Sequence, residues 1–285
     1  MRIKAIVTLY YPTQKTINNI KALVQQVDFL YLSDNTPFVF DNEDIKNEEK
    51  ITYIWNKQNL GLSSAFNSIL KKYHFTADDY ILFFDQDSFV KENHIKTLIQ
   101  EYILLQKKGI NVGCLGPVIF DKHLNAPFKI KSIKKINKFS FQVDHIITSS
   151  MLTTFSNLQE INFWDENIFL DMADWDICWR FNKLGKVCCI SECTVLEHSI
   201  GERRIKIGNF TILDENSVRF YYRIRDGLKL VLKSSTTCSN KLRILKVVSQ
   251  CSLFDYLFLK KKSDRLIYIF KGFRDFVRRK NGPYK

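Results

Sequence analysis

The apolar run Tyr-Ile-Leu-Phe-Phe at residues 80–84 leads directly into Asp85, Gln86 and Asp87. A short, unbroken apolar run predicts a strand that is buried on both faces, as in the parallel sheets of α/β proteins. In open α/β sheets, ligands bind just beyond the carboxyl ends of the strands. Two carboxylates held close together there need a cation or hydrogen-bond donors to compensate their charge. The pattern therefore favours a divalent cation that carries a diphosphate, with a solvated acidic turn as the simpler alternative.

The first 120 residues alternate between apolar runs and amphipathic stretches. Strands are expected at residues 3–9, 29–33, 51–55, 80–84 and 112–115, and helices at about 15–27, 62–72 and 91–108. This alternation predicts an α/β fold with right-handed crossovers and a mostly parallel sheet flanked by helices. The lysine-rich residues 120–139 have little periodicity, so we expect a surface loop or hairpin there.

The composition fits one large α/β domain with an appendage. The 285 residues are 45% hydrophobic, which is enough to fill a core of that size. We find no signal-peptide pattern and no uncharged apolar stretch of the length that spans a membrane, so a cytoplasmic location is expected.

The seven cysteines are an odd number, which fits reduced thiols better than a disulfide framework. Cys178, Cys188, Cys189 and Cys193 lie near His198 in the sequence, so a structural zinc site must be considered. However, the chain has no paired Cys-x-x-Cys units, and adjacent cysteines on a strand point to opposite faces. Zinc is therefore not expected.

Four motifs follow one another along the chain: Asn-Leu-Gly at 59–61, Asp-Gln-Asp-Ser at 85–88, Phe-Leu-Asp-Met-Ala-Asp-Trp-Asp-Ile-Cys-Trp-Arg at 169–180 and His-Ser-Ile-Gly at 198–201. In this order and spacing they closely resemble glycosyltransferase family 2, the inverting transferases with the GT-A fold. Within that family the pattern is most similar to bacterial rhamnosyltransferases of surface-polysaccharide synthesis. The resemblance covers about residues 3–232.

The resemblance implies a nucleotide-sugar site at the carboxyl ends of the first strands. Its expected members are Thr8, Tyr10, Asp34, Asn59, Gly61, Asp85 and Gln86. Without the resemblance, Asp34 fits a turn-forming role before Asn35 equally well. Gly61 would allow close approach of the backbone to a ligand, or it would serve only the start of a helix.

The resemblance also implies a metal ion, Mg²⁺ or Mn²⁺, that is held by Asp87 together with Asp85. Asp85 should face the ribose and the metal, and His198 is expected to join the metal ligands. The ion would bridge the diphosphate oxygens and neutralise charge as the leaving group departs.

By the same resemblance, Asp174 is the catalytic base, which takes the proton from an acceptor hydroxyl as that oxygen attacks the anomeric carbon. Attack opposite the nucleotide inverts the sugar configuration. Ala173 stands where the family usually has an acidic residue, and Asp171 is expected to supply that charge. An acidic first turn of a helix, favoured by the helix dipole, is the alternative for these residues. Candidate residues of the acceptor side, which packing explains equally well, are Asp171, Trp164, Asp165 and Trp175.

Positive charge is concentrated near the C-terminus. Residues 241–285 carry 13 Lys and Arg against three Asp, a net charge of +10 out of +13 for the whole chain. We therefore divide the chain into a GT-A catalytic domain at residues 1–235 and a basic amphipathic helical tail at 236–285. The tail should form two helices, the second with an apolar stripe of Leu266, Ile269, Phe270, Phe273, Phe276 and Val277. Such a basic amphipathic helix suits an anionic membrane surface, unless the stripe packs on the domain.

The sequence as a whole predicts an inverting, metal-dependent transferase that moves L-rhamnose from dTDP-L-rhamnose onto a lipid-linked oligosaccharide of lipopolysaccharide O-antigen or capsule. It would act at the inner face of the bacterial cytoplasmic membrane. UDP-galactose, UDP-glucose and UDP-galactofuranose are alternative sugar donors. A nucleic-acid-binding protein is the alternative from another class, given the pI near 9.3. Because the basic residues gather in one tail, no nucleic acid partner is expected, and intact Asp87 and Asp174 argue against an inactive scaffold.

Overall fold

The computed structural model describes residues 1–121, 125–128, 131–198, 203–207, 210–214, 216–255 and 262–284. Its strands are β1 (Ile3–Leu9), β2 (Phe29–Asp34), β3 (Ile51–Trp55), β4 (Tyr80–Asp85), β5 (Val112–Asp121), β6 (Ala126–Pro127), β7 (Ser132–Lys135), β8 (Ser140–Val143), β9 (Met151–Thr154), β10 (Val187–His198), β11 (Arg203–Ile207) and β12 (Phe210–Asp214). Its helices are α1 (Gln14–Val24), α2 (Glu43–Lys46), α3 (Gly61–Leu70), α4 (His94–Lys107), α5 (Phe155–Glu160), α6 (Ala173–Lys183), α7 (Val218–Leu232), α8 (Cys238–Ser249), the π-helix η1 (Gln250–Asp255) and α10 (Lys262–Val277).

The large sheet has the strand order β3-β2-β1-β4-β9-β5-β10-β8-β7, and β6 pairs with β5. Strands β3, β2, β1 and β4 are parallel, as the alternating sequence predicts. Beyond β4 the sheet is mixed, because β9 is antiparallel to both of its neighbours and β8 is antiparallel to β10. The α/β fold is therefore confirmed, and the sheet is mixed where the sequence indicated a mostly parallel one.

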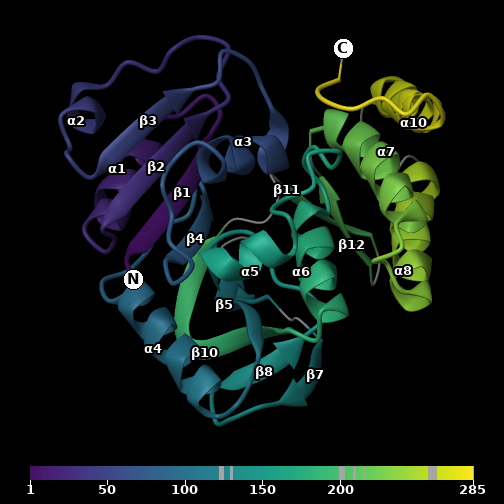
Figure 1. The fold of residues 1–285 in the computed structure, drawn as a ribbon. Coiled ribbons are helices and arrows are strands. Elements are labelled where there is room, and N and C mark those ends of the chain that lie inside the picture. Colours follow the sequence, from purple (N-terminus) through teal and green to yellow (C-terminus); the bar gives the residue numbers. More distant parts are fainter. Residues whose placement is uncertain are drawn as a thin grey trace.

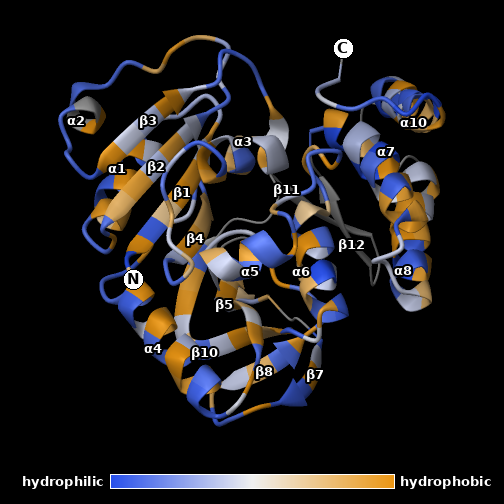
Figure 2. Cartoon of the chain, in the orientation of Figure 1, coloured by the Kyte–Doolittle hydropathy of each residue, from blue (hydrophilic) through white to orange (hydrophobic). Residues whose placement is uncertain are grey.

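Helices cover both faces of this sheet (Figure 1). Successive residues of β4 alternate between the two cores: Ile81 and Phe83 pack in the core with α3, α5, α6 and α7, whereas Leu82 and Phe84 pack in the core with α1 and α4. Figure 2 shows the apolar central strands between these layers. This double burial explains why residues 80–84 are uniformly apolar.

Strand β5 continues six residues beyond its predicted end at Leu115. Pro117 lacks an N–H, but it pairs with Ser191 next to a register shift in β10, which passes from Ser191 to Val195. A bulge is where a strand tolerates proline. In the following lysine-rich segment, β7 pairs with β8, so the hairpin alternative holds for its described residues.

The C-terminal helices lie together on one side of the molecule, where α7 contacts both α8 and α10 (Figure 1). The face of α10 toward α7 is formed by Arg265, Ile269, Gly272 and Asp275. A Cβ on Gly272 would lie 3.0 Å from the carbonyl oxygen of Tyr221, so the two helices approach closely there. The outer face carries exposed apolar side chains: Leu266, Ile267, Phe270, Phe273 and Val277. The expected stripe is therefore split, because Ile269 packs inward. None of the described helices combines the length and the hydropathy needed to cross a bilayer.

Candidate functional site

A cavity of about 610 Å³ lies beyond the carboxyl ends of β1, β2 and β4. Six of the seven residues expected at the nucleotide-sugar site line this cavity: Thr8, Tyr10, Asn59, Gly61, Asp85 and Gln86. The opposite wall comes from later parts of the chain: Phe169, Leu170, Asn216, Val218, Arg219, Tyr222, Pro283 and Tyr284. Sequence motifs located the first wall and, in the second, Phe169 and Leu170 at the start of the 169–180 motif. The rest of the second wall depends on tertiary packing.

Gln86 fixes the edge of the sheet at this cavity. Its side-chain amide donates to the carbonyl oxygen of Tyr10 at 2.9 Å, and its Oε1 accepts from the Tyr10 N–H at 2.8 Å. Asn19 of α1 donates to the carbonyl oxygen of Gln86 at 3.0 Å. These contacts hold the ends of β1 and β4 in register, so Gln86 acts on the shape of the cavity through Tyr10.

Asp34 lies behind the cavity wall. Its side chain is completely buried, and its oxygens accept from Oγ1 of Thr36 and the hydroxyl of Tyr53, both at 2.6 Å. The next residue, Asn35, lines the cavity and donates to the carbonyl oxygen of Gly61 at 3.1 Å. Asp34 thus stabilises the turn after β2, and Asn35 is the residue of this turn whose side chain lines the cavity.

Gly61 brings the start of α3 against Phe169. Its φ of +79° lies in the left-handed region, and a Cβ there would be 2.4 Å from the carbonyl oxygen of Phe169. Leu62 donates its N–H to that same oxygen at 2.6 Å. A side chain at position 61 would separate the two walls of the cavity, so glycine is required for both backbone conformation and close approach.

Asp85 is the last residue of β4, and Asp87 follows it two positions later. Oδ2 of Asp85, which lines the cavity, accepts a 2.5 Å hydrogen bond from Ser149, and Asp87 is exposed. Asp85 at the cavity and the exposed Asp87 just after it are a pair of carboxylates that fits a hard divalent cation. His198 is the last residue of β10, and its side chain, like residues 199–202, lies outside the described part of the structure.

Asp171 is held by two arginines of α7. Its Oδ1 lies 2.5 Å from Nη2 of Arg219 and 3.9 Å from Nη2 of Arg223. Burial alone would raise the pKa of Asp171, but the two guanidinium groups outweigh it and keep the pKa below its usual range. Asp171 is therefore a charged link between the acidic motif and α7. Among the described residues that line the cavity, Arg219 is the one cation.

Asp174 lies in the first turn of α6, and its pKa is shifted in the opposite direction to that of Asp171. It is partly exposed and accepts a hydrogen bond from its neighbour Trp175 at 2.9 Å. Burial by the surrounding protein raises its pKa to about 7, and the nearby His145 opposes the rise. A carboxyl group that titrates near neutral pH is suited to accept a proton in a reaction at that pH.

The remaining acidic residue of the motif, Asp176, is buried and pairs with Arg180 at 2.8 Å and with Lys233. Asp165 pairs with the same Lys233 at 2.5 Å. The pair of Asp176 with Lys233, the residue that follows α7, fastens the start of α6 to the end of α7.

Of the two tryptophans expected on the acceptor side, one lies in the core and one is half-buried. Trp164 is 2% exposed and packs on Phe66 and Phe83, so it is a core residue. Trp175 is half-buried, with its ring centroid 4.9 Å from that of His145. The guanidinium carbon of Arg243, from α8, lies 6.0 Å from the Trp175 ring centroid. His145 and Arg243 had no motif to mark them, because they approach Trp175 only in the folded chain.

In the folded chain, Cys114 joins two of the cysteines that cluster in the sequence, Cys178 and Cys188. The Sγ atoms of Cys114, Cys178 and Cys188 lie within 4.8 Å of one another, fully buried. Cys189 packs in the core on the opposite face of the sheet, as expected for adjacent strand residues. The described cysteines are free thiols.

Two sequence comparisons bear on this arrangement. Residues 32–155 match the family model described as glycosyl transferase family 2. The chain is also 26% identical over 243 residues to the dTDP-rhamnosyl transferase RfbF of Shigella flexneri, covering 81% of this chain and 80% of that protein. The chain is a glycosyltransferase, and its residues 32–155 resemble family 2. Over most of its length it is similar to a rhamnosyltransferase.

Solved structures confirm the GT-A fold. The structure of GalNAc-T7 with UDP, GalNAc and Mn²⁺ aligns with 98% of this chain at a TM-score of 0.55 and 10% identity. S. aureus TarS aligns with 98% of the chain at a TM-score of 0.58 and 13% identity. The match covers 56% and 49% of those two chains, so this glycosyltransferase spans about half of their length.

Proposed function

We propose that this glycosyltransferase moves L-rhamnose from dTDP-L-rhamnose onto a lipid-linked oligosaccharide during synthesis of a bacterial surface polysaccharide, lipopolysaccharide O-antigen or capsule. The observation that carries the proposal is the convergence of six predicted nucleotide-sugar residues on one cavity. The likeness to a dTDP-rhamnosyl transferase supports this sugar donor over UDP-galactose, UDP-glucose or UDP-galactofuranose.

Asp85 and Asp87 would hold a divalent cation, Mg²⁺ or Mn²⁺. When bound, the cation neutralises charge on the diphosphate leaving group. Arg219 borders the same cavity and supplies a fixed positive charge from the protein. Thr8, Tyr10, Asn35, Asn59 and Gly61 would bind the nucleotide around the ends of β1 and β2. The charges on the two sides of the cavity suit a bound diphosphate.

Asp174 would act as the base in the transfer step. Its carboxylate takes the proton of the acceptor hydroxyl as the oxygen attacks the anomeric carbon from the side opposite the nucleotide. The C–O bond to the diphosphate breaks as the new glycosidic bond forms, so the configuration inverts. Two observations favour Asp174 over Asp171: its pKa of about 7, and the engagement of Asp171 by Arg219 and Arg223. Asp171, Asp165 and Trp175 would then shape the acceptor side.

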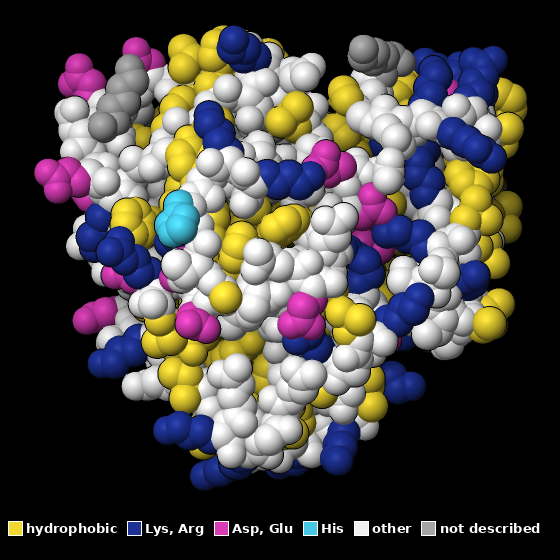
Figure 3. Space-filling view, viewed as in Figure 1, with side chains coloured by type: hydrophobic (Ala, Val, Ile, Leu, Met, Phe, Trp, Pro, Cys, Tyr) yellow, Lys and Arg dark blue, Asp and Glu magenta, His cyan; other side chains and the backbone are white. Residues whose placement is uncertain are grey.

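The outer face of α10 would dock on an anionic membrane surface from the cytoplasmic side. Leu266, Phe270, Phe273 and Val277 recur at helical spacing and are 40–77% exposed. Figure 3 shows hydrophobic side chains beside Lys and Arg on this side of the molecule. Burial of apolar side chains together with attraction of basic residues to anionic lipid is the usual mode of binding for such helices. This location would place the active site near a lipid-linked acceptor.

A panel of nucleotide sugars tests the proposal directly. Because a ligand that binds only the folded state raises the melting temperature with its affinity, the panel gives a ranking. We expect dTDP-L-rhamnose with Mn²⁺ or Mg²⁺ to give the largest rise, and chelation to reduce it. If a UDP sugar ranks first, the choice of sugar donor is wrong. If no nucleotide sugar raises the melting temperature, the assignment of the cavity is wrong.

A further inference from the structure

The segment 281–284 leads, through Pro283 and Tyr284, to the same cavity as the ends of β1 and β4. Pro283 and Tyr284 line it together with Tyr222 of α7 and Phe169. These two residues belong to the basic tail at residues 236–285. They follow α10, which packs against α7, so the fold of the tail determines where they lie.

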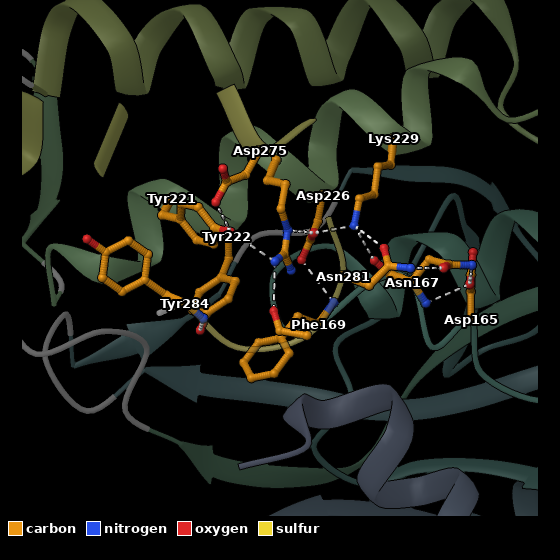
Figure 4. Close-up of polar contacts among 12 residues, drawn as sticks. Asp165, Asn167, Phe169, Tyr221, Tyr222, Asp226, Lys229, Asp275, Asn281 and Tyr284 are labelled. Atoms are coloured by element: carbon orange, nitrogen blue, oxygen red, sulfur yellow. Dashed lines mark hydrogen bonds and ion pairs between the residues drawn. The ribbon is translucent and has the colours of Figure 1, made fainter. Parts of the chain in front are cut away.

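The segment is attached by hydrogen bonds at successive positions. Nη1 of Arg225 donates to the carbonyl oxygen of Gly282 at 2.7 Å, and the N–H of Tyr284 donates to the hydroxyl of Tyr222 at 2.8 Å. Asn281 accepts from Nζ of Lys229 at 2.8 Å. Figure 4 shows how these side chains converge from α7 on the end of the chain. A segment held at three of its four positions is a built part of the fold.

Aromatic packing fixes the ring of Tyr284 as well. Its centroid lies 5.0 Å from those of Tyr221 and Tyr268, in edge-to-face geometry. The adjacent Tyr222 is stacked on Phe169, with centroids 4.5 Å apart and an interplanar angle of 13°. Together, Phe169, Tyr222, Pro283 and Tyr284 form an apolar wall of the cavity, facing the polar wall that contains Asp85 and Asn59.

One buried ion pair supports both ends of this wall. Nε of Arg225 lies 2.7 Å from Oδ1 of Asp226, and both side chains are fully buried. Arg225 holds Gly282, whereas the other oxygen of Asp226 accepts the N–H of Phe169 at 2.9 Å. The positions of Phe169 and of residues 283–284 are therefore coupled.

We propose that residues 281–284 are part of the sugar-donor site, and that Pro283 and Tyr284 contact the bound nucleoside diphosphate sugar. The inference rests on the proposed function, since it takes this cavity as the sugar-donor site. Aromatic rings bind the faces of bases and sugars, and a stacked base contributes roughly 1–3 kcal/mol in other proteins. Asp174 is not among the residues that line this cavity, so we expect the wall to bind the ground state and the transition state alike. Its loss then raises KM for the sugar donor and leaves kcat unchanged.

Calorimetry with dTDP and Mn²⁺ tests the inference on the full-length protein. Tyr284→Ala should raise Kd about tenfold, a change that corresponds to about 1.4 kcal/mol. Tyr284→Phe keeps the ring and should remain within about twofold of wild type, since it loses only the contact of the hydroxyl with Lys271. Phe139→Ala, at a side chain that is 41% exposed just before β8, is the matched control and should not change Kd.

A wild-type protein that binds dTDP and a Tyr284→Ala variant with the same Kd would overturn this inference and leave the proposed function standing. A wild-type protein that does not bind dTDP would overturn both. A second measurement needs no variant and so is independent of any effect on folding. Bound dTDP should slow the exchange of the Tyr284 main-chain N–H, which donates to the hydroxyl of Tyr222, with deuterium in the solvent. An unchanged rate at saturating dTDP would contradict the contact.

Discussion

Oδ2 of Asp226 accepts a hydrogen bond from the main-chain N–H of Phe169 at 2.9 Å, which ties α7 to the segment that leads into the acidic motif. Phe169 in turn accepts the N–H of Leu62 at 2.6 Å, so α3 is part of the same chain of contacts. Three segments that are far apart in the sequence thus meet at Phe169. The shape of the cavity depends on a carboxylate that does not line it.

Replacement of Asp226 by alanine should therefore affect both stability and ligand binding. The change leaves the guanidinium of Arg225 buried without its partner, and breaking a buried pair costs roughly 3–5 kcal/mol. We expect a loss of about 3 kcal/mol in the free energy of unfolding, measured with denaturant, and weaker binding of dTDP. Asp264→Ala, at an exposed position at the start of α10, is the control. A loss below about 1 kcal/mol would show that the pair is dispensable.

The polar wall of the cavity could be predicted from the sequence because its residues lie at the ends of parallel strands. Thr8, Asp85 and Gln86 follow apolar runs whose pairing the alternating pattern specifies, and the carboxyl ends of such strands meet at one edge. Asp34 was placed at that edge as well, and its side chain turned inward because Thr36 and Tyr53 offer hydrogen bonds there. Local sequence shows where a turn lies, but the partners of its side chains come from the folded sheet.

The apolar wall could not be predicted in this way. Tyr284 reaches the cavity only because α10 packs on α7, and no local pattern marks that contact. The apolar stripe of α10 was visible as a periodicity, but periodicity does not say which way a stripe faces. Burial of Arg265 and Asp275 on the inner face decides this, since Tyr221 donates to Asp275 at 3.0 Å and the apolar side chains are left outside.

Asp87→Asn should abolish the metal-dependent part of nucleotide-sugar binding and leave the fold intact. The exposed carboxylate can be replaced by an amide without a change in packing, but the amide loses the charge that attracts a hard cation. Calorimetry of dTDP-L-rhamnose with and without Mn²⁺ measures the effect. Asp78→Asn, at an exposed carboxylate before the other end of β4, should behave as wild type. Unchanged metal-assisted binding in Asp87→Asn would remove this residue from the metal site.

Asp174→Asn should retain binding of the sugar donor and lose transfer. General base catalysis contributes roughly 10²–10⁴-fold, so kcat should fall at least about a hundredfold. In the wild type, kcat should rise with pH up to the pKa of about 7 and then level off, since the base works only when deprotonated. If Asp171→Asn is inactive and Asp174→Asn is active, the base has been misassigned.

The same raised pKa predicts how the stability of the fold depends on pH. The pKa of Asp174 rises from an ordinary value of 3.8 to about 7 in the folded protein, so its proton stabilises the folded state. That stabilisation is complete below about pH 4 and is lost as the pH rises through 7. Asp174→Asn cannot lose a proton. Its melting temperature relative to wild type should therefore be higher at pH 8 than at pH 5, and an equal difference at both values would contradict the shift.

Negative charges introduced into the exposed apolar stripe on α10 should release the protein from anionic vesicles while sparing dTDP binding. A double variant, Phe270→Asp with Val277→Asp, changes the two most exposed apolar side chains of the stripe, at 73% and 77%, and leaves Pro283 and Tyr284 in place. Deletion of α10 and the residues after it would be a poorer test, because it would also remove Pro283 and Tyr284 from the cavity wall. Binding of the wild type should weaken at high salt, since the Debye length is about 8 Å at physiological ionic strength and shorter above it. Co-sedimentation with anionic and with neutral vesicles measures both effects. Leu104→Asp, at a side chain that is 42% exposed on α4, is the matched control. If wild type and double variant sediment equally with anionic vesicles, the outer face of α10 is not the membrane-binding surface.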